Sequence, residues 1–318
     1  MSSKTLLASL LAFAPLALAQ DPACDCYVTN GENPQYYSGH MFFDFRSLQQ
    51  HARVPDLIDT QQGNADAPFT SDYFNWESEF GQTWGVQSWP NGKEGLPMQN
   101  SLNNLYIEEN YDGSLGGDTW LTMRTARHNG FLSASEFESI NKYQFASMRM
   151  YARTVGDPGA CTAMFTYLKG DSLATVQEAD IEVLTKDDPK AIHYTNQPSY
   201  TEEGGVVEGA HLEVTLPDGL TRSDWAKHRM DWTPGATVWS VNDKETWRNA
   251  FQVPRDPAQL VFNAWSDGGD WTGTLPEGGS AYQQIMWIEI LHGSADAATC
   301  QRKCSVDQGG EIGKPVPV

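Results

Sequence analysis

Short runs in which apolar and polar side chains alternate recur along the chain, and turn-forming residues separate them. Alternation with a period of two is typical of a β-strand that buries one face. No long stretch has the 3.6-residue period of an amphipathic helix, and no internal repeat is visible. The pattern therefore predicts an all-β fold, a sandwich or jelly roll, with strands in segments that include 120–125, 145–151, 163–167, 238–241, 260–265 and 285–290.

We expect one large all-β domain, because the length of the chain after cleavage of the signal peptide suits a single domain. The main β-sandwich is predicted for residues 76–293. Residues 20–75 are less regular, and we expect them to wrap the sandwich as an N-terminal extension. Residues 294–318 form a predicted C-terminal tail that contains cysteine.

The first 19 residues have the pattern of a secretory signal peptide. Lys4 is followed by an almost wholly apolar run over residues 6–18, and Ala17-Leu18-Ala19 matches a cleavage site of small residues. The run is too short for a membrane span, and no later stretch is apolar enough for one. We therefore expect a secreted protein, cleaved near Ala19, that does not associate with a membrane.

The charge of the chain limits its partners. Asp and Glu number 41 against 21 Lys and Arg, which gives a formal net charge of −20. Such a charge argues against binding to nucleic acid or to anionic lipid and is compatible with a neutral substrate. Aromatic residues make up 11% of the chain, which suits either a sugar-binding cleft or a large core. We expect a monomer.

Four of the five cysteines lie near the ends of the chain. In an oxidising compartment we expect disulfides, and a Cys24–Cys26 bridge would be strained at that spacing. The prediction is that Cys24 and Cys26 pair with Cys300 and Cys304, in either combination. Cys161 lies in a predicted strand and is expected to be a buried free thiol.

The segment 178–183, Glu-Ala-Asp-Ile-Glu-Val, carries the clearest candidate chemistry. On a strand, Glu178, Asp180 and Glu182 share one face. Their outer Cα atoms would lie roughly 13 Å apart, and side chains that lean inward bring the carboxyl groups to roughly 5–6 Å, the spacing of a retaining glycosidase. Two other interpretations remain open at this point, which are the solvated face of an acidic edge strand and a calcium site.

Several segments in order resemble glycoside hydrolase family 16. The acidic strand resembles the family's active-site strand, and the rest of the set consists of Tyr194-Thr195-Asn196, Asp231-Trp232-Thr233-Pro234-Gly235, Asn263-Ala264-Trp265 and Asp270-Trp271-Thr272-Gly273. The resemblance covers residues 100–292. It implies an all-β jelly-roll sandwich of two antiparallel sheets, of the concanavalin A-like type, with the glycan across the concave face.

The resemblance also implies roles for individual residues. Glu178 would be the nucleophile, Glu182 the general acid/base, and Asp180 an aid to the nucleophile. The predicted substrate-binding residues are Asn263, Trp265, Tyr194, Asn196 and Trp271, whereas we expect a structural role for His193. No cofactor and no catalytic metal are expected, and a structural calcium is left open.

One segment departs from the pattern of the bacterial lichenases. Where these carry Glu-Tyr-Arg-Thr, this chain has Glu136-Phe137-Glu138-Ser139, so its subsites are expected to differ. The active-site motif lacks the extra residue found in many laminarinases, which disfavours a strict β-1,3-glucanase. The leading hypothesis is a secreted retaining endo-β-glucanase that degrades a neutral polysaccharide. The alternatives are a cell-wall transglycosylase and a non-catalytic lectin of the same fold.

Overall fold

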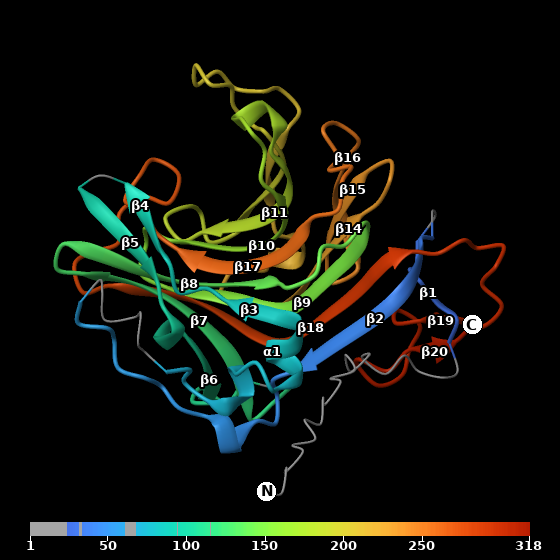
Figure 1. Cartoon of the computed structure of the whole chain (residues 1–318), viewed down its shortest axis with the longest axis horizontal. Coiled ribbons are helices and arrows are strands. Elements are labelled where there is room, and N and C mark those ends of the chain that lie inside the picture. The colour runs from blue at the N-terminus through green and yellow to red at the C-terminus, as the bar shows by residue number, and fades with distance from the viewer. Residues whose placement is uncertain (1–23, 32–33, 61–67, 94, 115) are drawn as a thin grey trace, which may run out of the picture.

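The computed structural model describes residues 24–31, 34–60, 68–93, 95–114 and 116–318. They form two stacked, curved β-sheets, which lie one above the other in Figure 1. This all-β jelly-roll sandwich confirms the predicted fold class. In the described segments, the strand pairings are antiparallel except β1–β19 and β5–β8.

The lower sheet in Figure 1 is centred on the long strand β18. On one side of β18 follow β9, β14, β15 and β16. On its other side, β7 and then β6 pair along its first part, and β2, β1, β19 and β20 extend from its last part. The bounds are β18 (Ser280–Ser294), β9 (Ala146–Gly156), β14 (Ala226–Trp232), β15 (Thr237–Val241), β16 (Lys244–Asn249), β7 (Thr119–His128), β6 (Leu105–Glu109), β2 (Tyr36–Asp44), β1 (Cys26–Val28), β19 (Lys303–Ser305) and β20 (Val316–Pro317).

The upper sheet has the order β13-β12-β11-β10-β17-β8-β3. The first part of β8 also pairs with β7 and with the β4–β5 hairpin, so this strand joins the two sheets. The bounds are β13 (His211–Thr215), β12 (Ala191–Gln197), β11 (Gln177–Leu184), β10 (Cys161–Leu168), β17 (Gln259–Trp265), β8 (Phe131–Ser139), β3 (Trp84–Val86), β4 (Pro90–Lys93) and β5 (Leu96–Asn100).

Helical structure is confined to short segments. The helix α1 (Glu79–Thr83) begins at Ser78, whose hydroxyl accepts a hydrogen bond from the backbone of Gly81 at 2.9 Å. Single 3-10 turns lie at Gln49–His51, Asp72–Phe74, Leu102–Asn104, Leu173–Thr175 and Pro217–Gly219. No helix in the described segments is both long and apolar enough to cross a membrane.

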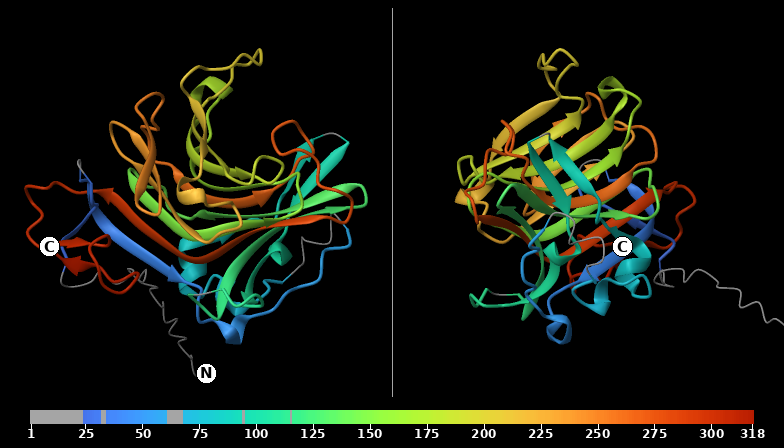
Figure 2. Two further views of the ribbon diagram at one scale, coloured as in Figure 1. Left: turned by 180° about the vertical axis from the view of Figure 1, so that it is seen from behind. Right: turned by 60° about the vertical axis from the view of Figure 1, so that its left-hand side comes forward.

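The main core lies between the two sheets and is rich in aromatic side chains. Trp84, Phe137 and Phe262 pack against one another there, with ring centroids 4.9–5.6 Å apart. The inward positions of β11, Ala179, Ile181 and Val183, belong to the same cluster, so the core holds the upper sheet from below. The two views of Figure 2 show the sheets stacked in this way from behind and from the side.

Part of the predicted N-terminal extension is an integral strand. Residues 36–44 form β2, which pairs with β18 over most of its length, so the expectation that 20–75 only wraps the sandwich is wrong for this segment. The reason is its alternation, since Tyr37, Met41 and Phe43 are buried and the residues between them are not.

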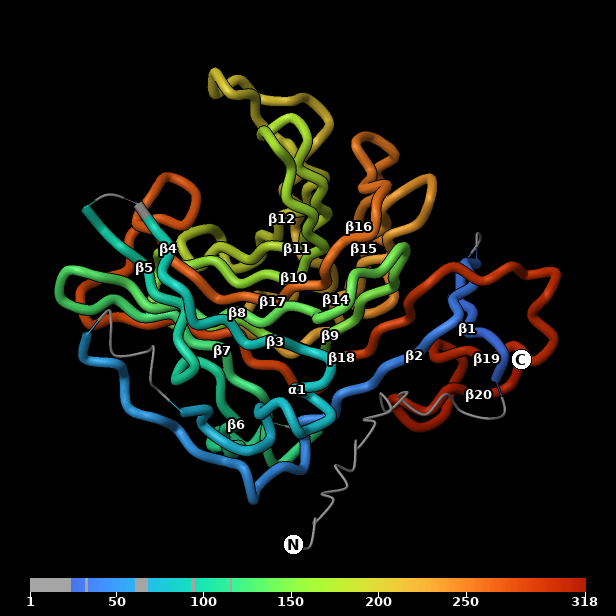
Figure 3. The backbone as a smooth tube through the Cα atoms, viewed as in Figure 1, coloured from blue at the N-terminus to red at the C-terminus, as the bar shows by residue number. Residues whose placement is uncertain are grey.

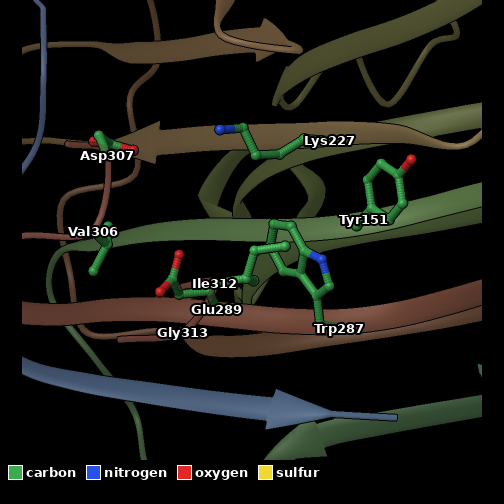
Figure 4. Close-up of a pocket in the computed structure, with 8 residues that line it drawn as sticks. All are labelled: Tyr151, Lys227, Trp287, Glu289, Val306, Asp307, Ile312 and Gly313. Carbon is green, nitrogen blue, oxygen red and sulfur yellow. The ribbon is translucent and has the colours of Figure 1, made fainter. Parts of the chain in front are cut away.

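The C-terminal tail is attached to the lower sheet by covalent and ionic contacts. Disulfides join Cys24 to Cys304 and Cys26 to Cys300, and Cys161 is a buried free cysteine, as predicted. Asp307 of the tail accepts hydrogen bonds from Arg149 at 3.2 Å and Arg229 at 3.3 Å. Beside these groups lies a pocket of about 290 Å³, shown in Figure 4. The residues that line it are Val306, Asp307, Ile312 and Gly313 of the tail with Tyr151, Lys227, Trp287 and Glu289 of the sheet.

Removal of the Cys24–Cys304 disulfide should lower the free energy of unfolding by about 2–4 kcal/mol, because the bond closes a very long loop in the unfolded chain. The Cys24→Ser/Cys304→Ser double variant can be compared with the wild type by urea denaturation. Alkylation of the unfolded, unreduced wild-type protein should label Cys161 alone. Labelling of any other cysteine would contradict the pairing.

Candidate active site

The three acidic residues of β11 lie together on the outer, concave face of the upper sheet. Ala179, Ile181 and Val183 point into the core, so strand alternation directs Glu178, Asp180 and Glu182 to the opposite side. Asp180 is fully buried and the two glutamates are half-buried. The prediction that these carboxyl groups share one face is therefore confirmed.

Neighbouring strands complete the floor of a small pocket around these residues. Across the ladder from β11, Ala163 lies opposite Glu182 and Phe165 lies opposite Asp180. On the next strand, Asn263 lies opposite Ala163. Together with Trp265, these residues line a pocket of about 100 Å³ that also contains all three carboxyl groups. Figure 3 shows the β4–β5 and β15–β16 hairpins rising at either side of this sheet.

Burial and mutual repulsion favour the protonated forms of the triplet. Burial, with a further contribution from the charge of Glu182, raises the pKa of Glu178 to about 8. The pKa of Asp180 is raised well above its ordinary value by burial and by both glutamates, against a smaller opposing contribution from Thr195. Burial also raises the pKa of Glu182. The three groups therefore cannot all be ionised near neutral pH.

Glu182 differs from the other two carboxyl groups because two side chains donate hydrogen bonds to it. The indole Nε1–H of Trp271 donates to its Oε1 at 3.1 Å, and the thiol of Cys161 donates to the same oxygen at 3.3 Å. These hydrogen bonds oppose the effect of burial on the pKa of Glu182. Trp271, a predicted substrate-binding residue, therefore contacts Glu182 of the acidic strand directly.

An aromatic stack holds β11 from the core side. The indole Nε1–H of Trp239 donates to the backbone carbonyl of Asp180 at 2.8 Å. The rings of Tyr194 and Trp247 both stack on Trp239, at centroid distances of 5.3 and 5.0 Å. The sequence analysis did not identify this support, because the three aromatic residues lie on different strands.

The prediction that Tyr194 and Asn196 bind substrate is wrong. They pair with Ile181 and Ala179 across the β11–β12 ladder, so they share the core face of these residues. Tyr194 is fully buried and its hydroxyl contacts Thr246. The Asn196 amide donates to the carbonyl of Phe251 and accepts from Thr237. Both side chains therefore have internal structural roles.

His193 lies on the carboxylate face instead, directly opposite Glu182, so the structural role expected for it is not supported. Its Nε2 is 2.9 Å from an Asp187 oxygen, and its Nδ1 is 3.1 Å from Nε2 of His211. Both imidazole rings meet Trp271 edge-on. Asp187, His193 and Glu213 offer donor atoms within 4.8 Å of one another, the spacing of a divalent-cation site, although the His193 nitrogens already have partners.

The remaining predicted binding residues lie on the same face as the triplet. Asn263 donates to Glu136 at 3.4 Å, and its Oδ1 is buried without a partner among the described residues. Trp265 is half-buried at the end of β17. Glu136 and Glu138 of β8 extend the acidic surface, and burial raises the pKa of Glu136 to about 7.

Comparison with known proteins shows the family to which the chain belongs. The model of glycosyl hydrolases family 16 matches residues 98–289, which is more than half of the chain, so the protein belongs to this family. A beta-glucanase of Acetivibrio thermocellus is 23% identical over 219 residues, which span 65% of this chain and 58% of that protein. A xylanase/beta-glucanase of Ruminococcus flavefaciens is 26% identical over 134 residues, 42% of this chain and only 16% of that protein.

Solved structures share the fold at low sequence identity. The Bacillus licheniformis beta-glucanase is 18% identical with a TM-score of 0.52, and the match covers 66% of this chain and 92% of that one. A lichenase from a mouse hindgut metagenome is 17% identical with a TM-score of 0.52, covering 79% and 98%. These similarities show that the chain shares the jelly-roll fold of these proteins.

The raised pKa of Glu178 predicts a pH-dependent cost in stability. A carboxyl group whose pKa is higher in the folded state stabilises the protein at acid pH, and this contribution is lost as the pH rises from about 4.5 to about 8. Glu178→Gln should therefore be more stable than the wild type at pH 8, by roughly 1–3 kcal/mol, and similar to it at pH 4.

Thermal unfolding of both proteins at the two pH values measures this difference. Glu109→Gln, at the exposed end of β6, is the control for loss of one acidic group, and its effect should be small at both pH values. A Glu178→Gln variant that is no more stable than the wild type at pH 8 would show that the triplet carries no electrostatic cost.

Proposed function

We propose that this protein is a retaining glycoside hydrolase that cleaves β-glucan by double displacement. The observation that carries the proposal is the triplet of carboxyl groups on one face of β11, on the concave side of a family 16 sandwich. A lectin of the same fold has no need of such a triplet, which costs stability through burial and repulsion.

In the first step, the carboxylate of Glu178 attacks the anomeric carbon while Glu182 donates its proton to the glycosidic oxygen. The bond to the leaving sugar breaks as the bond to Glu178 forms. Loss of the charge on Glu182 favours ionisation of Glu178, because that charge is one cause of its raised pKa. Protonation of Glu182, which the first step requires, therefore favours the ionised Glu178 that the same step requires.

In the second step, Glu182 acts as a base. It takes a proton from a water molecule whose oxygen attacks the anomeric carbon, and Glu178 leaves as a carboxylate. Asp180 lies between the two glutamates, and its strongly raised pKa favours the protonated form. From there it can donate a hydrogen bond to Glu178 as the charge on that residue returns. No step requires a metal or a cofactor.

A neutral β-glucan is the substrate class that the concave face suits best. Carboxyl groups on β8 and β11 would repel an acidic polysaccharide, while Asn263 and Trp265 offer an amide and a flat ring to a neutral sugar. A neighbour in fold, an endo-glucanase of Bacteroides ovatus with a TM-score of 0.52, was solved in complex with G4G3G-2F-DNP. Glu138 stands where bacterial lichenases carry Arg, so we expect a subsite that differs from theirs.

We also propose that the protein is secreted. The predicted signal peptide, residues 1–19, lies outside the described part of the chain. Two disulfides support an oxidising compartment. Secretion would bring the enzyme to polysaccharides that lie outside the cell.

Glu178→Gln should abolish hydrolysis, with a loss of more than about 10⁴-fold, because the amide is isosteric but a poor nucleophile. Rates can be measured on the best substrate from a screen of β-1,3-, mixed-linkage and β-1,4-glucans. Product analysis with an added acceptor oligosaccharide separates hydrolysis from transfer. Activity near that of the wild type in a folded Glu178→Gln protein would exclude Glu178 as the nucleophile.

Glu182→Gln should lower activity on glucan by about 10²–10⁴-fold. With an activated aryl glycoside the first step needs little acid assistance, so the glycosyl-enzyme should still form. Azide should then restore turnover and yield a β-glycosyl azide, because it needs no base to attack. Absence of rescue in a folded variant would count against Glu182 as the acid/base.

A further inference from the structure

The two oxygens of Glu182 have different surroundings. Oε1 accepts two hydrogen bonds, one from Trp271 Nε1–H at 3.1 Å and one from the Cys161 thiol at 3.3 Å. No hydrogen bond of Oε2 is found among the described residues. Both donors come from outside β11, because Cys161 belongs to β10 and Trp271 to the loop after β17.

Cys161 is suited to act as a permanent donor. It is fully buried and forms no disulfide. Burial and the charge of Glu182 both raise the pKa of the thiol well above its ordinary value, so the sulfur keeps its proton. Trp265, directly opposite on β17, is a further hydrogen-bonding partner of the sulfur. An inert, protonated thiol of this kind is the reverse of a nucleophilic cysteine.

Trp271 is held in place from its other side. Its ring meets His193 at 5.2 Å and His211 at 5.6 Å, edge-on in both cases. Those two imidazoles stack at 5.3 Å, and His193 is anchored on Asp187. The loop that carries Trp271 is closed by hydrogen bonds from Gly269 and Thr272 to the Asp267 carboxylate, and Lys186 donates to the carbonyl of Asp270.

We propose that Cys161 and Trp271 are positioning residues that reserve Oε1 of Glu182 as a hydrogen-bond acceptor, so that Oε2 alone exchanges protons with the substrate and with water. A carboxyl oxygen that already accepts two hydrogen bonds is a poor place for the proton, which resides on the other oxygen. This inference deepens the proposed function and rests on Glu182 being the acid/base.

The assignment makes both proton transfers specific to one atom. In the first step, the Oε2–H proton moves to the glycosidic oxygen as the bond from that oxygen to the anomeric carbon breaks. In the second step, Oε2 takes a proton from water while the water oxygen binds the anomeric carbon and Glu178 departs. Oε1 keeps its two donors throughout, so the carboxyl group does not rotate between the steps.

The test is the pH dependence of kcat/KM in variants that remove one donor. Both donors stabilise the ionised form of Glu182. The loss of either should therefore move the alkaline limb of the kcat/KM profile, where Glu182 loses its proton, to higher pH by roughly one unit. Cys161→Val removes the thiol donor at similar size, and Trp271→Phe removes the indole donor but keeps a ring. Cys161→Ser retains a donor and should move the limb much less.

The other groups that act on Glu182 remain in these variants. Glu178 and Asp180 on β11 and His193 on β12 are unchanged. A shift of the alkaline limb therefore reports the loss of the hydrogen-bond donor. Met164→Leu, on the core face of β10, is the packing control and should leave the limb where it is in the wild type. A purely structural role of Cys161 would lower the rate or the melting temperature without any shift of the limb.

A second readout does not depend on activity. The ¹⁵N signal of the Trp271 indole should titrate with Glu182 in the wild type, and this titration should vanish in Glu182→Gln. In Cys161→Val its midpoint should move to higher pH. An unchanged midpoint and an unchanged alkaline limb in folded Cys161→Val would overturn the inference. Wild-type activity of Glu182→Gln would instead overturn the proposed function, so the two failures are distinguishable.

Discussion

The geometry of an antiparallel ladder is the constraint on which the site depends. Alternation along β11 directs three carboxyl groups to one face of the sheet. The alternate side chains of the strand pack in the core and so fix the position and direction of these groups. Burial raises the pKa of all three above the ordinary value, and the charges of neighbouring carboxylates raise those of Glu178 and Asp180 further. The same placement that weakens the folded state at neutral pH is the one on which the proposed nucleophile and proton donor depend.

The rest of the sandwich keeps this unfavourable arrangement in place. Trp239 hydrogen-bonds the backbone of Asp180 from below, and Tyr194 and Trp247 stack on its ring. At the edge of the lower sheet, two disulfides and Asp307 fix the tail. A rigid support of this kind allows the carboxyl groups to stay close without relaxing apart.

The sequence predicted the fold class and the outward face of β11, because strict alternation of polar and apolar residues allows only one assignment of side chains to the two faces. The neighbouring strand β12 does not alternate in this way. In His193-Tyr194-Thr195-Asn196, either assignment puts one ring and one polar group on each face. Cross-strand register decided between them and placed His193 beside Glu182. The contact of Cys161 with Glu182 spans 21 residues and two strands, and no local pattern indicates it. The alternation in β2, by contrast, was visible and could have been recognised.

The stereochemistry of cleavage tests the central claim most directly. Two glutamates four residues apart on a strand leave roughly 5–5.5 Å between their carboxyl groups, too little for a water molecule on the far face of the sugar. In the proposed mechanism Glu178 then attacks directly, and two displacements restore the anomeric configuration. Early-time NMR of the hydrolysate should show the β-anomer first, with the α-anomer growing only by mutarotation. An initial α-product would mean inversion and would contradict the double displacement.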